Sequence, residues 1–298
     1  MQHHFQAQVS SIRHDRRVLT GLHTLVASLF IITALVVSAA AHAETLRLSG
    51  TGTALGTMRL LGEAYKKTDP QFVLEIVPNL GSGGSLKALE RDAIQLATIG
   101  RPLTAAEAAK GFNVVEYGKT PFVIATARKG TAALALAQIA EIYAGKQARW
   151  PDGTPIRLVL RPVSESDTPL LASFSPAIKE GLASAMAREG MITALTDQDS
   201  ATEISRLPGG LGTSSLALIL SEKRPLFPLA IEGVTPSAKS LADGTYPYAK
   251  TLYFATYGKA SASVTRFIAF VQSAEGRRIL ADTGHVPTDL SVTRASAR

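Results

Sequence analysis

The sequence predicts an α/β fold, and two features of the residues after position 44 lead to this prediction. Short apolar runs alternate with stretches in which apolar residues recur every three or four positions, which is the pattern of strands followed by amphipathic helices. Three successive apolar runs end at turns rich in Gly, Ser and Thr. Because open α/β sheets bind ligands at the carboxyl ends of their strands, these turns are the first candidates for a functional site.

The individual elements follow from local patterns. We expect the first three strands at residues 45–49, 72–77 and 94–99, with a helix after each of the first two. Further along the chain we expect strands at 120–127 and 156–160 and a helix at 136–143. Another helix is expected to start at Thr168-Pro169. Near the C-terminus we expect one helix that ends at residue 271 and a next one that runs from the N-cap Ser273 to Gly284. With 298 residues, 46% of them hydrophobic, the chain is long enough for one large domain or two medium ones.

The first 43 residues are typical of an export signal. They combine basic Arg13, Arg16 and Arg17 with an apolar run over 25–41 and the small-x-small triplet Ala41-His42-Ala43. We therefore expect cleavage near Ala43, a mature chain that starts at Glu44, and a periplasmic location. An uncleaved membrane anchor is the alternative, and the pair Arg16-Arg17 leaves the choice between general and twin-arginine export open.

Composition excludes several classes of function. The chain has no Cys, so it has no disulfide, thiolate metal site or thiol nucleophile. Its formal charge is +7, of which +5 remains after the leader, but the basic residues are scattered, and nucleic acid is not an expected partner. His285 is the one His beyond the leader, so neither a metal site nor a catalytic His dyad is expected. We therefore predict no enzyme activity and no cofactor.

Two small polar turns indicate an anion site. Ser49-Gly50-Thr51-Gly52-Thr53 and Gly81-Ser82-Gly83-Gly84-Ser85 each lie between an expected strand and an expected helix. Glycine allows a tight backbone path, and amides at a helix N-terminus bind anions. A third polar junction, Ser164 to Pro169, follows Arg161 in the expected second half of the fold.

The order of several motifs resembles that of a known family. The motifs are the turns at 50–53 and 81–84, Arg101-Pro102-Leu103, the segment 139–145 with Trp150, Arg161 with Ser166-Asp167-Thr168, and the C-terminal segments 233–237, 244–247, 267–270, 273–276 and 284–287. On these residues the chain is similar to the phosphate-type periplasmic substrate-binding proteins of ABC importers. The resemblance implies a two-lobed periplasmic-binding-protein type 2 fold, in which each lobe is a mixed sheet flanked by helices and a hinge joins them. By the same analogy, residues 44–120 plus 234–298 form the first lobe and 121–233 the second.

The resemblance also implies a function and a ligand set. It implies a monomeric receptor that binds inorganic phosphate between its lobes and delivers it to an inner-membrane ABC permease. The ligand-binding residues that it implies are Thr53, Ser82 and Gly83 from the first lobe, and Arg161, Ser166 and Thr168 from the second. Thr51, Gly84, Arg101 and Asp167 are further candidate ligand-binding residues beside them. Trp150 and Tyr143 are expected to be packing residues. Other oxyanions (sulfate, molybdate, tungstate), organic phosphates or carboxylates, and a sensor or adaptor role with the same fold, remain alternatives.

Two positions depart from the family pattern. The family's phosphate receptors carry an Asp that accepts the phosphate proton where this chain has Gly100, and a Gly where this chain has Asp167. One hypothesis is that Asp167 replaces the missing acceptor, and the alternative is that it only caps the helix near Pro169. Arg101 is expected either to face the anion or to pair with a nearby acid such as Glu107.

Overall fold

The computed structural model describes residues 45–78, 80–131 and 133–289. The predicted export signal and its cleavage site lie outside these residues. These described residues belong to one compact unit. Over the described ranges, no helix has the length and apolar character needed to cross a bilayer.

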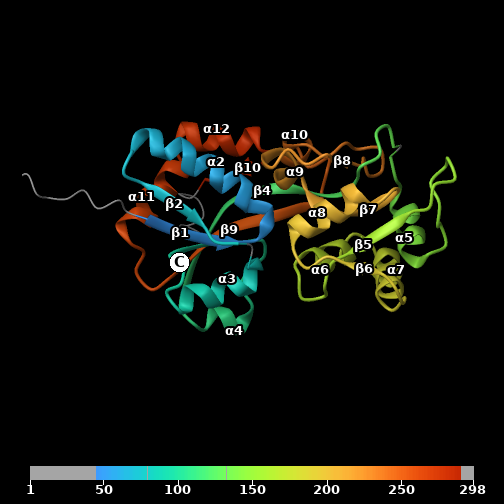
Figure 1. The fold of residues 1–298 in the computed structure, drawn as a ribbon, viewed down its shortest axis with the longest axis horizontal. Coiled ribbons are helices and arrows are strands. Elements are labelled where there is room, and N and C mark those ends of the chain that lie inside the picture. Colours follow the sequence, from blue (N-terminus) through green and yellow to red (C-terminus); the bar gives the residue numbers. More distant parts are fainter. Residues whose placement is uncertain (1–44, 79, 132, 290–298) are drawn as a thin grey trace, which may run out of the picture. The chain divides into compact units, whose positions relative to one another are not determined.

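The first lobe is built on a mixed sheet (Figure 1). Strand β1 (Thr45–Gly50) pairs in parallel with β2 (Val73–Ile76) on one side and β3 (Leu96–Ile99) on the other. β3 then pairs antiparallel with β9 (Ala249–Tyr257), and β9 with the long strand β4 (Phe112–Thr126). The short strand β10 (Val286–Pro287) adds to β4. The carboxyl ends of β1 and β3 therefore lie next to each other at one edge.

The second lobe continues from the far end of β4. Residues 122–126 of this strand pair antiparallel with β7 (Gly210–Ser215), and its last residues with β8 (Phe227–Pro228). β7 pairs in parallel with β5 (Arg157–Leu160), and β5 with β6 (Ile192–Thr193). One strand is thus shared by both sheets, and it runs from lobe to lobe beside β9 (Figure 1).

Helices flank both sheets. Those of the first lobe are α2 (Gly52–Thr68), α3 (Gly81–Glu90), α4 (Ala105–Ala108), α11 (Ala262–Val271) and α12 (Ala274–Asp282). Those of the second lobe are α5 (Leu136–Ala144), α6 (Asp167–Ala172), α7 (Pro176–Met186), α8 (Asp197–Arg206) and α9 (Leu216–Ser221). Helix α10 (Ala238–Ala242) lies on the returning segment between β8 and β9.

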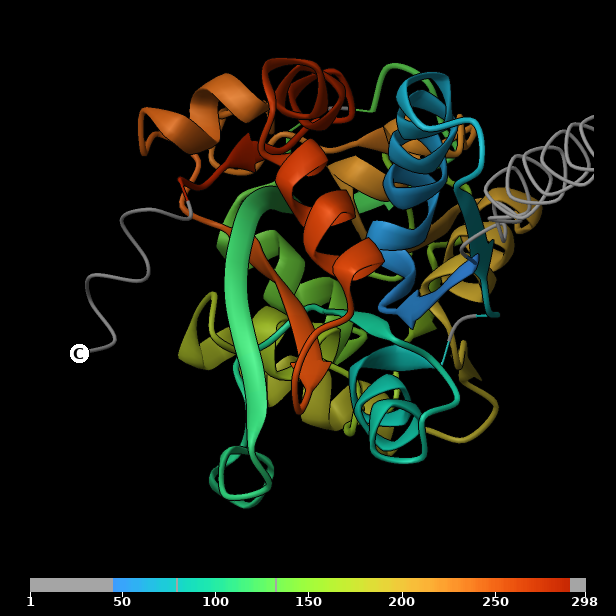
Figure 2. The same cartoon turned by 90° about the vertical axis from the view of Figure 1, so that its left-hand side faces the viewer.

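Aromatic side chains dominate the core of the first lobe. Helices α2 (blue) and α11 (orange-red) lie side by side over the sheet in Figure 2. Between them, the Tyr65 ring contacts Phe72 edge-on at 4.6 Å, and Phe72 stacks on Phe267 at 5.5 Å. The apolar side chains on one face of α2, among them Leu55, Met58 and Leu61, are all buried here.

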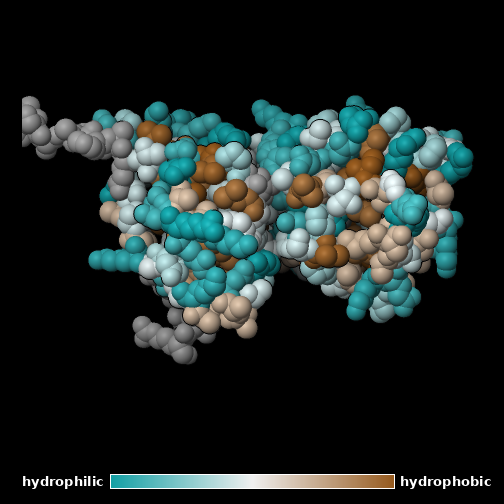
Figure 3. Space-filling view, turned by 60° about the horizontal axis from the view of Figure 1, so that its bottom comes forward, coloured by the Kyte–Doolittle hydropathy of each residue, from teal (hydrophilic) through white to brown (hydrophobic). Residues whose placement is uncertain are grey.

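The second lobe has a core on each face of its sheet. Side chains of β4 alternate between them, with Phe122 and Ile124 in one cluster and Val123 and Ala125 in the other. Tyr143 and Trp150 are buried in the first cluster, as predicted, and the Trp150 indole donates a hydrogen bond to the Gly209 carbonyl at 3.2 Å. On the outer surface, small groups of hydrophobic residues lie among hydrophilic ones (Figure 3).

Most expected elements are present, with shifts at their ends. The strand expected at 120–127 is the last part of a longer strand that begins at Phe112, and helix α6 begins at Asp167 instead of Pro169. The lobe boundaries at 120 and 233 stay a prediction. Tyr246 packs in the second lobe's core, and Phe122 donates its amide proton to Tyr248, so we propose that the return to the first lobe occurs near residue 248.

Candidate functional site

The N-terminus of α2 presents two hydrogen-bond donors toward the second lobe. A Cβ on Gly50 would lie 2.0 Å from the Thr98 carbonyl oxygen, so only Gly lets β1 end this close to β3. The Thr51 amide donates to the same carbonyl at 2.9 Å, which fixes the turn into α2. The Thr51 hydroxyl and the Thr53 amide are thereby left to bind a group beyond the helix end. Both residues are buried, as a ligand contact between lobes requires.

Those two donors bind a carboxylate of this same chain. Oδ2 of Asp197 accepts from the Thr51 hydroxyl at 3.1 Å and from the Thr53 amide at 3.0 Å. Asp197 is the first residue of α8, in the second lobe, and 8% of its surface is exposed. A helix N-terminus favours negative charge, so this is an anion site with an anion in it. Sequence reasoning missed Asp197; the only local signal was the capping box of Thr196 and Asp199, which marks a second helix start.

Two buried cations complete the cluster. Nζ of Lys250, from β9, lies 2.5 Å from Oδ1 of Asp167 and 3.7 Å from Oδ1 of Asp197. Nη2 of Arg161, just after β5, lies 3.5 Å from Oδ1 of Asp197, and Nη1 donates to the Ala194 carbonyl at 2.6 Å. The side chains of Lys250, Arg161 and Asp167 are each no more than 3% exposed. Two carboxylates therefore balance two cations in a largely buried cluster, in which Asp197 is the most exposed member at 9% of its side chain.

The electrostatics of the cluster keep Asp197 and Lys250 ionised. Burial acts to raise the pKa of Asp197, but Lys250 and Arg161 outweigh it, and the pKa lies below its ordinary value. Burial acts to lower the pKa of Lys250, but Asp167 and Asp197 outweigh it, and the pKa is raised. Both groups are therefore charged at neutral pH. Glu165, at the rim and 3.5 Å from Arg161, has a pKa raised chiefly by partial burial.

Lys250 explains the departure at Gly100. A Cβ at residue 100 would lie 2.8 Å from Cε of Lys250 and 3.4 Å from Oγ1 of Thr51. The lysine thus fills the space that an acidic side chain at residue 100 would need. The amide of Gly100 donates to Oγ of Ser82 at 3.0 Å, which places the Gly81 turn beside the end of β3.

The Gly81 to Ser85 turn forms the first turn of α3. Gly81 has a positive φ of 66°, which is the conformation for which a glycine was expected there. Ser82 is buried, whereas Gly83 and Gly84 are partly exposed. A Cβ on Gly83 would have Nη2 of Arg101 as its nearest neighbour, at 3.9 Å, so there is room for a side chain at this position beside that guanidinium.

Arg101 pairs with Glu107, which was the second of the two expected arrangements. Its Nη1 and Nη2 donate to the two carboxylate oxygens at 2.7 and 2.8 Å. The hydrogen bond from Arg101 lowers the pKa of Glu107 to about 2 and raises the pKa of Arg101. Both terminal guanidinium nitrogens of Arg101 thus bind the Glu107 carboxylate, and Nη1 also donates to the Pro102 carbonyl at 2.9 Å.

The predicted residues of the second lobe bond mostly within that lobe. Ser166 occupies the N-cap position of α6 but makes no side-chain cap bond. The Thr168 hydroxyl donates to the carbonyls of Arg161 and Pro162, both at 2.9 Å. The Asp167 carboxylate accepts from the Thr213 hydroxyl at 3.2 Å and from Lys250, so the expectation that it caps α6 is wrong. Its role as a proton acceptor stays a prediction.

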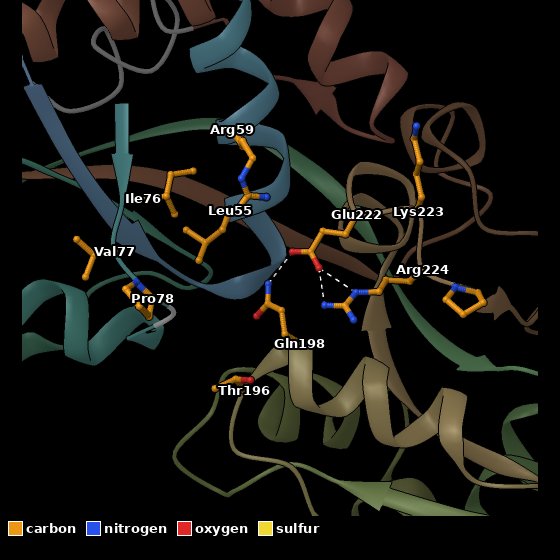
Figure 4. Close-up of a pocket in the computed structure, with 11 residues that line it drawn as sticks. Leu55, Arg59, Ile76, Val77, Pro78, Thr196, Gln198, Glu222, Lys223 and Arg224 are labelled. Carbon is orange, nitrogen blue, oxygen red and sulfur yellow. Dashed lines mark hydrogen bonds and ion pairs between the residues drawn. The ribbon is translucent and has the colours of Figure 1, made fainter. Parts of the chain in front are cut away.

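A cleft of about 910 Å³ adjoins the anion site (Figure 4). Gln198, next to Asp197, donates to the Gly52 carbonyl at 3.1 Å and to Glu222 at 2.8 Å, and Arg224 pairs with the same Glu222 at 2.7 Å. The cleft is lined by Leu55, Arg59, Ile76, Val77, Pro78, Thr196, Gln198, Glu222, Lys223, Arg224 and Pro225. It lies between α2 and the end of β2 on one side and the start of α8 and the end of α9 on the other (Figure 4).

No metal site accompanies the cluster: the described residues hold no group of three His, Cys, Asp or Glu side chains arranged to bind an ion. His285 is fully buried, and its Nδ1 lies 3.1 Å from the Leu280 carbonyl oxygen. Burial lowers its pKa to about 4. It therefore serves as a neutral packing residue.

The chain is similar in sequence to known binding proteins. A family model described as a PBP superfamily domain matches residues 36–275. The phosphate-binding protein PstS of Bacillus subtilis (strain 168) is 26% identical over 266 residues, which cover 84% of this chain and 83% of that protein.

Solved structures share the fold at lower identity. A Clostridium perfringens substrate-binding protein with bound phosphate, assigned to a phosphate ABC transporter, superposes with a TM-score of 0.69 at 19% identity, covering 83% of this chain and 100% of that one. A high-affinity periplasmic phosphate-binding protein, PfluDING, gives 0.64 at 15% identity, with 85% and 94% covered. The periplasmic molybdate-binding protein of Azotobacter vinelandii gives 0.56 at 14%, with 82% and 100% covered. The same two-lobed fold therefore occurs in receptors for different oxyanions.

Proposed function

The chain belongs to the PBP superfamily domain family, and from this premise we propose that it is a receptor of an ABC importer that binds inorganic phosphate between its two lobes. The PstS relative supports phosphate by its name, and its match extends over most of both chains. A periplasmic location, a monomeric state and delivery to an inner-membrane permease belong to the same proposal.

One observation carries the proposal: the N-terminus of α2 holds an anion. The Thr51 hydroxyl and the Thr53 amide converge on one carboxylate oxygen, with Arg161 on the far side of that carboxylate. An oxygen of phosphate accepts hydrogen bonds from the same kinds of donor, and a guanidinium binds a second oxygen well. We propose Thr51, Thr53, Ser82 and Arg161 as the principal ligand residues. Gly83, Gly84, Ser166, Asp167 and Thr168 are proposed with them as surrounding residues that shape the site.

Lys250 adds a positive charge that sequence reasoning did not include. It is buried at the end of β3, beside Thr51, where the family's acidic residue would otherwise stand. In place of a proton acceptor, this wall of the site carries a cation. We infer that the site favours an oxyanion by charge, through Lys250 and Arg161, and that Arg101, which pairs with Glu107, contributes little to ligand binding.

The test is calorimetric titration of the purified protein with phosphate, sulfate, molybdate, tungstate and a phosphate monoester. Arg161→Ala removes a charge-assisted hydrogen bond and should weaken phosphate binding about 10- to 100-fold. Lys110→Ala, which removes an exposed cation paired with Glu90, is the matched control and should leave binding unchanged. Clear heat with another anion and none with phosphate would contradict the phosphate assignment. No heat with any of these ligands would contradict the receptor function itself.

A further inference from the structure

We propose that Asp197 is a tethered anion that occupies the ligand position, holds the two lobes together in the absence of ligand, and must be displaced by the incoming phosphate. This inference rests on the proposed function for the identity of the ligand. The contact between lobes does not depend on that identity.

The first step is that ligand and carboxylate use the same donors. Both the Thr51 hydroxyl and the Thr53 amide direct their hydrogens at Oδ2 of Asp197, at 3.1 and 3.0 Å. An N–H group that makes one good linear hydrogen bond has no second one to give. Phosphate can therefore bind the N-terminus of α2 only after the Asp197 carboxylate has left it.

The second step is that the contact joins two separately anchored lobes. Helix α8 is fixed to the second sheet because Ala201 and Ile204 pack in its core and the Ser200 hydroxyl donates to the Thr213 carbonyl at 3.1 Å. Helix α2 packs on the first sheet. The hydrogen bond from Gln198 to the Gly52 carbonyl adds a second contact between the same two helix ends. Two successive residues of α8 thus bind the first turn of α2 and oppose lobe opening.

The third step is charge balance. Lys250 and Arg161 face Asp197 and Asp167, with Glu165 at the rim, so the buried carboxylates already match the buried cations. A phosphate added to this set would place unbalanced negative charge in a water-poor site, which is costly. Exchange of the Asp197 carboxylate for a singly charged phosphate, H2PO4⁻, keeps the balance. The low pKa of Asp197 means that it leaves as a carboxylate, not as a neutral acid.

The fourth step is that solvent lies within one residue of Asp197. Its neighbours in the chain, Thr196 and Gln198, both line the cleft, and Gln198 is bound there to Glu222 (Figure 4). Movement of the first turn of α8 toward this cleft gives the released carboxylate water as a replacement for Thr51 and Thr53. A receptor that is closed when empty must open before it binds ligand. Its apparent dissociation constant is therefore the intrinsic one divided by the fraction of molecules that are open.

The experiment compares the wild type with Asp197→Ala, Asp197→Asn and Glu63→Gln. Glu63 is an exposed acid on α2, eleven residues beyond Gly52, so its substitution removes one negative charge from the same helix without touching the site. Small-angle X-ray scattering without added anion reports lobe opening, and titration with phosphate reports affinity. Circular dichroism establishes that each variant is folded.

We expect the empty wild type and Glu63→Gln to scatter as the closed form and empty Asp197→Ala to scatter as a more open one. We expect both Asp197 variants to bind phosphate at least about tenfold more tightly than the wild type, since the competitor's charge is gone. An open wild type without anion overturns the proposal by itself, even if both variants fail to fold. Weaker or unchanged phosphate binding by a folded Asp197 variant also overturns it. If the variant opens but neither protein binds any oxyanion, the contact between lobes stands and the proposed function fails.

Discussion

Replacement of Lys250 by Met should destabilise the protein by about 3–5 kcal/mol at neutral pH, the usual cost of removing one partner from a buried ion pair. The side chain is 2% exposed, and its Nζ lies 2.5 Å from Asp167 and 3.7 Å from Asp197. Met has nearly the same length, so it leaves the packing beside Gly100 intact and removes only the charge. The two carboxylates then share Arg161 as their one buried cation.

The pH dependence of the loss follows from the two carboxylates. In the wild type the folded-state pKa of Asp197 is lowered, so its contribution to stability is present above the unfolded value, about 3.9, and is lost as pH falls through the folded value. Without Lys250, one of the two carboxylates has a folded-state pKa above its unfolded value. The stability that such a carboxyl group contributes is present below the unfolded pKa and is lost as pH rises through the folded-state pKa. The difference between variant and wild type should therefore be full at pH 7 and shrink toward pH 4.

Urea unfolding at pH 7 and pH 4 measures the loss of stability and its pH dependence. In thermal unfolding at pH 7, the midpoint temperature should fall by about 6–20 °C. Lys110→Met, which breaks an exposed ion pair with Glu90, is the control and should cost less than about 1 kcal/mol. The double variant Lys250→Met with Asp167→Asn restores the charge balance and should be less destabilised than the two single losses added together. A loss below about 1 kcal/mol for Lys250→Met, or strict additivity in the double variant, would refute the charge-balance reasoning.

Three further outcomes are expected. Gly50→Ala should prevent stable folding, because its Cβ would lie 2.0 Å from the Thr98 carbonyl oxygen. Gly83→Ala has no neighbouring atom nearer than 3.9 Å and should keep the stability or raise it by up to about 1 kcal/mol. Thermal unfolding compares the two variants, and equal effects would contradict the packing described for these glycines. Burial lowers the pKa of His285 to about 4, so the free energy of unfolding should decline as pH falls from about 6.5 to about 4. In chemical unfolding, His285→Gln should make this decline with pH shallower. A decline of unchanged slope in the variant would show that another group causes it. Arg101→Ala should change phosphate affinity less than about threefold, because Glu107 holds the guanidinium, and a loss as large as that of Arg161→Ala in the same titration would return Arg101 to the ligand set.

The sequence predicts the strand ends and turns at the ligand-binding edge of the first sheet, but not the charged residues buried beside that edge. Apolar runs ending at Gly turns predicted β1 to β3, and parallel pairing brings the ends of β1 and β3 together. The hydrogen bond from the Gly100 amide to Ser82 shows that the Gly81 turn, which follows β2, lies at the end of β3. The Arg101 pair was also within reach, because Glu107 lies six residues away and local pairs depend little on topology.

Asp197 and Lys250 could not be found in the same way. Their partners lie far along the chain, 146 residues from Asp197 to Thr51 and 83 from Lys250 to Asp167. A single Lys in a strand and a single Asp at a helix start are ordinary surface residues by pattern alone. Only the pairing of β9 beside β3, and the packing of α8 against the second sheet, bury them beside each other. For the same reason, the local pattern at Asp167 indicates a helix cap or a ligand contact but not its pairing with Lys250.

The pairing of β9 between β3 and β4 also sets the order in which the chain can fold. Ala97 pairs with Ala255, so the first sheet lacks its central strand until 158 more residues have been synthesised. At typical rates of about 5–20 residues per second this takes roughly 8–30 s on the ribosome. During that time β1 to β3 have only each other, and β3 exposes an unpaired edge. The nascent chain therefore remains unfolded for long enough that chaperones can bind it, and the first lobe completes its sheet only when nearly the whole chain has been made.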